Sequence, residues 1–166
     1  QAFKFIVVDV GFCVEQDEEL SYDTIAPRRN GAAVDVLGTA DGVIAVAAAD
    51  PVGLVRFVRG VADLPRSADA SSPITVVNRV RRASIGRRDP VRQIALALGR
   101  YAELDDAVMV ADDAATADTA LASGRTWREV AATSPARLAI RDLARRVAGD
   151  PAVPARSRRR LLQVRA

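Results

Sequence analysis

Two apolar segments of the chain carry, at or near their ends, polar residues that could bind a ligand. Residues 3–12 read FKFIVVDVGF and contain Asp9, with Gly11 two positions later, and residues 73–78 read PITVVN and end at Asn78. Dense apolar runs are typical of strands buried on both faces of a parallel sheet. Because ligands of such sheets bind beyond the carboxyl ends of the strands, Asp9 is placed where a carboxylate could hold a metal-bound phosphate. The alternative is that Asp9 is a solvated turn residue that ends the strand.

The segments around these residues alternate between strand and helix patterns. Strands are expected over residues 3–12, 41–49, 73–78 and 107–110, and helices over residues 51–62, from Pro90 onward, over 114–123 and over 135–148. Asp50 followed by Pro51 is the usual chemistry of a helix start, and Ser134 is placed to cap the last helix. The alternation predicts an α/β fold with a mostly parallel sheet flanked by helices.

Composition agrees with one globular domain or part of one. The chain has 166 residues, of which 49% are hydrophobic and 27% charged. Its apolar stretches are too short to span a membrane, which predicts a cytoplasmic protein. A single cysteine, Cys13, excludes an internal disulfide, and the lack of histidine argues against a zinc site. We expect residues 1–149 to form the domain and residues 150–166 to form a basic tail.

Positive charge is carried almost entirely by arginine, since Lys4 is the only lysine. Two arginine clusters lie in residues 79–92 and in the tail; their members are Arg79, Arg81, Arg82, Arg87, Arg88 and Arg92, and Arg156, Arg158, Arg159, Arg160 and Arg165. Either cluster could bind nucleic acid, and the tail could also lie on anionic lipid. A solvated surface is the expected alternative, because runs of charge usually face water.

The order of the motifs over residues 3–147 resembles the C-terminal two-thirds of a MinD/ParA-type P-loop ATPase. The matching segments are FIVVDVG at residues 5–11 for the Walker B strand, ADGVIAV at 40–46, VVNR at 76–79, VADD at 110–113, ALASG at 120–124, and Ser134-Pro135. The resemblance implies a P-loop NTPase-like fold with ATP and magnesium as cofactors. Asp9 would hold magnesium indirectly and, with Gly11, help to place the attacking water. Asn78, Arg79, Asp112 and Asp113 would lie on the adenine side.

Two features depart from the family pattern. Ala111 stands where relatives have proline, which makes nucleotide preference less defined. No Gly-x-x-x-x-Gly-Lys-Ser/Thr loop occurs, so the main anchor of the triphosphate is lacking. The resemblance therefore implies that the N-terminal part of the fold, including Walker A, is missing from this chain. We expect the 166-residue chain to carry no bound nucleotide and to have no ATPase activity.

The resemblance implies a protein that positions cell-division, partitioning, or pilus and secretion machinery by ATP-dependent dimerisation. In general character the chain is most similar to the septum-site or pilus-localisation ATPases of the CpaE/TadZ kind. Its partners would be a second copy of itself and a polar or septal protein complex, with association to the membrane or nucleoid. The first alternative is a non-catalytic scaffold with a degenerate ATPase fold. The second is nucleic-acid binding through residues 79–92, which predicts an affinity that falls steeply with salt.

Overall fold

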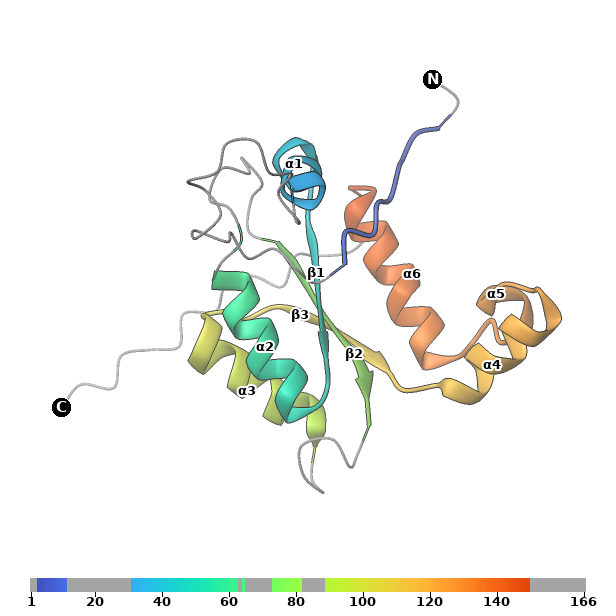
Figure 1. Cartoon of the computed structure of the whole chain (residues 1–166). Helices are drawn as coiled ribbons and strands as arrows, with labels where there is room; N and C mark the ends of the chain where they lie inside the picture. Colours follow the sequence, from blue (N-terminus) through green and yellow to red (C-terminus); the bar gives the residue numbers. More distant parts are fainter. Residues whose placement is uncertain (1–2, 12–30, 63, 65–72, 82–88, 150–166) are drawn as a thin grey trace.

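The computed structural model describes residues 3–11, 31–62, 64, 73–81 and 89–149. Helices and strands alternate along most of this part of the chain (Figure 1). The elements are α1 (Gly31–Thr39), β1 (Ile44–Ala48), α2 (Pro51–Ala62), β2 (Ile74–Val80), α3 (Pro90–Ala102), β3 (Ala107–Ala111), α4 (Ala114–Ser123), α5 (Trp127–Val130) and α6 (Pro135–Val147). None of these helices is long and apolar enough to cross a membrane.

The three strands form one parallel sheet in the order β1-β2-β3. Val46 pairs with Val76, and Val76 pairs with Val108, so these three residues share one face of the sheet. The pairing between β2 and β3 loses its regular register between Val77 and Val80. The predicted α/β class with a parallel sheet and flanking helices is confirmed at this level.

Helices cover both faces of the sheet and bury two apolar clusters (Figure 1). On one face α2 and α3 pack on the sheet through a cluster made of Ala47, Ala49, Leu54, Phe57, Val77, Ile94 and Leu98. On the other face α6 packs on β2 and β3 through Val76, Val110 and Ala136. Successive residues Val76 and Val77 point to opposite faces, as the two-residue period of a strand requires.

The strand expected over residues 3–12 is not formed over its described part, residues 3–11. Phe5, Ile6, Val7 and Val8 are 53, 82, 90 and 56% exposed. In the view of Figure 1 this segment lies toward the end of the molecule where β1 begins, away from the carboxyl ends of the strands. The expectation was wrong here because an apolar run becomes a buried strand only when an edge of the sheet pairs with it, and that pairing is not encoded locally.

Local cap chemistry places most helix boundaries where they were expected. The Asp89 side chain accepts a hydrogen bond from the Arg92 amide (3.1 Å) at the start of α3, and Ser134 Oγ accepts one from the Arg137 amide (3.4 Å) at the start of α6. Such bonds satisfy amide groups that have no partner within the first turn. The basic tail, residues 150–166, lies outside the described residues.

Candidate functional site

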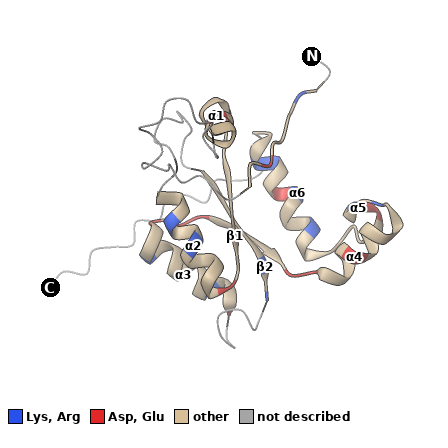
Figure 2. Ribbon diagram, viewed as in Figure 1, with Lys and Arg blue, Asp and Glu red and all other residues tan. Residues whose placement is uncertain are grey.

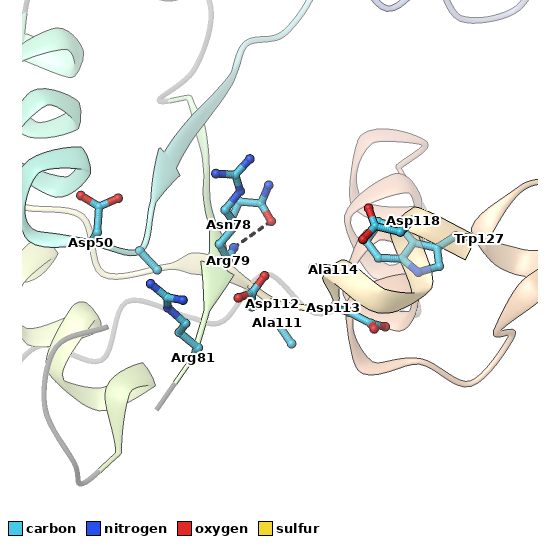
Figure 3. Close-up of a pocket in the computed structure, with 12 residues that line it drawn as sticks. Asp50, Asn78, Arg79, Arg81, Ala111, Asp112, Asp113, Ala114, Asp118 and Trp127 are labelled. Atoms are coloured by element: carbon cyan, nitrogen blue, oxygen red, sulfur yellow. Dashed lines mark hydrogen bonds between the residues drawn. The ribbon is translucent and has the colours of Figure 1, made fainter. Parts of the chain in front are cut away.

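A pocket of about 550 Å³ opens at the carboxyl ends of the three strands (Figure 3). Its lining comes from the residues that follow β1, from the end of β2, from the loop after β3, and from α4 and α5: Ala49, Asp50, Asn78, Arg79, Arg81, Ala111, Asp112, Asp113, Ala114, Ala117, Asp118 and Trp127. This volume is within the range of small-molecule sites, and the carboxyl edge is where open parallel sheets bind their ligands.

The wall next to β1 is built by the tight start of α2. Asp50 Oδ1 accepts a hydrogen bond from the Gly53 amide at 2.8 Å, and the Asp50 carbonyl accepts one from the Leu54 amide at 2.9 Å. A Cβ on Gly53 would lie 2.7 Å from the Ala48 Cβ and 2.8 Å from the Ala48 carbonyl oxygen. Glycine at position 53 therefore lets the first turn of α2 approach the end of β1 and fixes Asp50 at the pocket.

The floor at the end of β2 is shaped by an unusual backbone conformation. Arg79 has a φ of 61°, and its amide donates to the Asn78 side-chain oxygen at 2.8 Å. The Asn78 carbonyl accepts from the Ala49 amide at 2.9 Å, which ties the ends of β1 and β2 together. A left-handed conformation is uncommon for a residue with a side chain and is often found at functional sites. Within the part of the chain that the structure describes, Arg79 and Arg81 make no ion pair.

The loop after β3 contributes two carboxylates with different surroundings. Asp113 Oδ2 accepts a hydrogen bond from the Ser134 hydroxyl at 2.6 Å, and Oδ1 accepts one from the Thr116 amide at 3.4 Å. The bond from Ser134, followed by that from Thr116, lowers the pKa of the Asp113 carboxyl. Asp113 thus joins the starts of α4 and α6, and both of its oxygens are used within the fold. Asp112 is exposed, and its amide donates to the Val80 carbonyl at 3.0 Å.

Charges of both signs meet in this pocket. Figure 3 shows Asn78, Arg79, Arg81 and Asp112 in its middle, Asp50 on the α2 side, and Asp118 and Trp127 on the α4 side. Guanidinium groups suit phosphate or carboxylate oxygens, and a side-chain amide and a carboxylate suit the polar edge of a heterocycle. The pocket is therefore suited to a ligand that carries both an anionic group and a polar ring.

The structure brings together some of the predicted site residues and separates others. Asn78, Arg79, Asp112 and Asp113 line one pocket, although the sequence spreads them over more than thirty positions. Asp9 and Gly11 are exposed and do not belong to the described lining. Asp9 Oδ1 accepts a hydrogen bond from the Gly11 amide at 3.0 Å, a geometry that matches the turn-residue alternative. Among the described residues no group of three potential metal ligands occurs.

Besides four alanines, the lining contains four residues that were not predicted as nucleotide contacts: Asp50, Arg81, Asp118 and Trp127. Asp50 was expected only as a helix cap. The positions of Ala114, Ala117 and Asp118 are three and four residues apart, so they share one face of α4, and this spacing could have indicated Asp118. Trp127 had no such signal, because its place depends on its packing against Val76, Val110 and Ala136, which lie far from it in the sequence or on another element.

A scan of the sequence against protein-family models finds no match, and a search of curated proteins finds no match either.

Proposed function

We propose that this pocket is the base side of a nucleotide site and that the chain acts as part of a MinD/ParA-type ATPase. The observation that carries the proposal is that Asn78, Arg79 and Asp112 share one pocket at the carboxyl edge of a parallel sheet. Those residues were predicted from motif order, whereas the pocket follows from the packing of the chain. These three side chains supply an amide, a guanidinium and a carboxylate to a single pocket.

The hydrogen-bonding capacity of the pocket fits a purine nucleotide. The Asn78 side-chain oxygen already accepts from the Arg79 amide, so its NH2 group remains a donor for a ring nitrogen. Asp112 supplies an acceptor for an exocyclic amine, and Arg79 and Arg81 supply donors for phosphate oxygens. Adenine offers both a ring acceptor and an amine donor, which makes ATP the proposed nucleotide.

The remaining parts of an ATPase site are proposed from the resemblance. The sequence contains no Gly-x-x-x-x-Gly-Lys-Ser/Thr loop, so the described pocket lacks the backbone cradle that holds a triphosphate. We place no magnesium in the pocket, because its described carboxylates do not form a ligand group. From the resemblance, Asp9 is still proposed as the magnesium carboxylate, with Gly11 beside it; this role requires residues 3–12 to join the sheet as a strand, which the described residues 3–11 do not do. In a complete site, bound ATP and magnesium would switch dimerisation, and the dimer would position a septal, polar or partition complex.

The proposal is tested by measuring the binding of adenosine and ADP to the 166-residue chain with saturation-transfer NMR. Without the triphosphate anchor we expect dissociation constants in the millimolar range, about 4 kcal/mol of binding free energy, so that no nucleotide survives purification. Asn78→Ala and Asp112→Asn should each weaken binding several-fold, and no magnesium-dependent turnover should appear.

Asp105→Asn is the matched control for Asp112→Asn. Asp105 is also an exposed aspartate next to β3, but it precedes the strand and does not belong to the described lining of the pocket. Its substitution should leave binding unchanged. If neither adenosine nor ADP binds at all, the pocket is not a nucleotide site.

A non-catalytic scaffold is the second candidate function. The exposed apolar run from Phe5 to Val8 favours it, because four consecutive exposed apolar residues are unusual on a free surface and common where proteins associate. A scaffold would bind no nucleotide in the NMR experiment. It would instead form a stable complex with another protein, and that complex would be lost when Ile6 and Val7 are changed to serine.

Nucleic-acid binding through residues 79–92 receives less support. Of its arginines, Arg79 and Arg81 lie in the pocket beside carboxylates, and Arg82, Arg87 and Arg88 lie outside the described residues. Figure 2 marks basic residues on the ribbons of α2 and α6. On α6, Arg146 Nη2 lies 2.8 Å from Asp106 Oδ2, and Arg141 Nη2 lies 2.8 Å from Asp142 Oδ1. Binding to DNA that weakens steeply with added salt would revive this candidate.

A further inference from the structure

Trp127 occupies an unusual position at the edge of the pocket. Its ring packs against the cluster of Val76, Val110 and Ala136, and it also lines the pocket. Among the described residues of the lining it is the only aromatic one. Its indole Nε1 is buried and has no hydrogen-bond partner within the described part of the chain. Buried N–H groups are nearly always paired in native proteins, so this donor needs an explanation.

The segment that carries Trp127 is weakly held. We call α4 and α5 together the arm; it spans residues 114–130, and neither of its helices contains a buried residue. Figure 1 shows the arm projecting from the sheet beyond the start of α6. Within the described part of the chain, the arm is held by the hydrogen bond between Ser134 and Asp113 at its base and by the packing of Trp127. Because little apolar surface would be lost, a small shift of the arm costs little free energy.

We propose that Trp127 is a further ligand-binding residue of the site that stacks on the base; this inference rests on the proposed nucleotide function. The planar base packs against the face of the indole, and a shift of the arm lets Nε1, whose N–H lies in the plane of the ring, donate a hydrogen bond to a ribose hydroxyl beside the base. Aromatic side chains stack on bases of any kind, since every base has a π face. Asn78 and Asp112 then read the polar edge of the base, while the arm closes over its plane.

Intrinsic fluorescence reports on this contact directly, because Trp127 is the only tryptophan in the chain. We expect the emission of the unmodified 166-residue chain to change on titration with adenosine. Inorganic tripolyphosphate carries the anionic charge without a ring, so it should leave the emission unchanged even if it binds at Arg79 and Arg81. This measurement needs no variant and therefore does not depend on how a variant folds.

Two variants separate the ring from its N–H group. Trp127→Phe keeps an aromatic face and should weaken adenosine binding about two- to tenfold, the range of one hydrogen bond. Trp127→Leu removes the face as well and should weaken it further, by about fivefold or more from stacking alone. Neither variant should change the affinity for tripolyphosphate. Tyr101→Leu removes an exposed ring on α3 outside the described lining and is the matched control.

The outcomes distinguish this inference from the function on which it rests. If adenosine binds but the emission does not respond and Trp127→Leu binds as tightly as the unmodified chain, the contact is refuted while the nucleotide site stands. If the Trp127 variants lose affinity for adenosine and tripolyphosphate equally, the role of Trp127 is purely structural and the proposed contact is also refuted. If adenosine does not bind at all, both proposals fail.

Discussion

At the scale of the residue, the backbone conformation of Arg79 predicts that one substitution will raise stability and weaken ligand binding. Its φ of 61° costs about 1 kcal/mol for a residue with a side chain, and glycine adopts this conformation without that cost. We expect Arg79→Gly to raise the free energy of unfolding by up to about 1 kcal/mol while it weakens binding of phosphate-bearing ligands. Urea denaturation and NMR titration measure the two effects.

Arg81→Gly provides the comparison for that substitution. Arg81 lines the same pocket and carries the same charge, but its φ is not positive, so glycine relieves no strain there. Arg81→Gly should weaken the binding of phosphate-bearing ligands without raising the free energy of unfolding. A similar gain for both variants would mean that backbone strain at Arg79 is not the cause.

Gly53 and Gly60 lie in the same helix, α2, but differ in the space around them. A Cβ at position 53 would collide with Ala48, whereas nothing lies within 4 Å of a Cβ at position 60. We expect Gly53→Ala to lower the free energy of unfolding by about 1–3 kcal/mol, the usual cost of overpacking. Gly60→Ala should raise it by about 0.5–1 kcal/mol, because alanine is the better helix former.

Thermal or urea unfolding of the two variants checks this pair. Because the clash at position 53 pushes Asp50 from the pocket wall, Gly53→Ala should also weaken ligand binding, and Gly60→Ala should not. If Gly53→Ala and Gly60→Ala have the same free energy of unfolding, α2 does not approach β1 as closely as the structure shows.

At the scale of the element, Asp113 connects two helix starts through hydrogen bonds that favour its charged form. The pKa of the Asp113 carboxyl is lower in the folded protein than in the unfolded one. The stabilisation is therefore fully present above the unfolded pKa of this carboxyl, and it is lost as the pH falls through the lower folded pKa. We expect Asp113→Asn to destabilise the protein at neutral pH and to approach the stability of the unmodified chain below about pH 4. Urea unfolding at several pH values measures the difference.

Asp105→Asn again serves as the control, since among the described residues Asp105 makes no hydrogen bond to a helix start, unlike Asp113. Its effect on stability should be small at every pH. A difference between Asp113→Asn and the unmodified chain that stayed constant down to low pH would contradict the role of the Asp113 charge.

Helix boundaries were predictable because their signals are local. The helix over residues 51–62 follows Asp50-Pro51 and the one from residue 135 follows Ser134-Pro135, and both begin where these caps place them. The strand over residues 73–78 was predicted too short, because the irregular turn of the backbone at Arg79 lets pairing resume at Val80. A bulge depends on the partner strand and has no strong signal in its own sequence.

The candidate site was predictable only where its residues end strands. Asn78 and Asp112 follow apolar runs, and the carboxyl ends of parallel strands meet at one edge, so their proximity follows from the fold class. Trp127 lies at the pocket because of where the arm packs, and Arg81 because of how the chain leaves β2. Both depend on tertiary packing, which a single sequence does not reveal.

At the scale of the whole molecule, the sheet is covered unevenly. Val46 of β1 lies on the same face as Val76, but α6 packs over β2 and β3 and leaves Val46 60% exposed. The exposed segment from Phe5 to Val8 adds further apolar surface outside the described core. Among the described residues, the two apolar clusters lie where α2, α3 and α6 pack on the sheet.

Two isoleucines of the same size test this division between core and surface. Ile94 of α3 is 0% exposed, and Ile6 is 82% exposed. Ile94→Ala should lower the free energy of unfolding by about 2–5 kcal/mol, because it removes buried methyl groups and leaves a cavity. Ile6→Ala should change it by less than about 0.5 kcal/mol, as for other surface positions. If residues 3–12 form the buried strand that their sequence suggests, the two substitutions will instead destabilise the protein alike in urea unfolding, and Asp9 would then end a strand of the sheet.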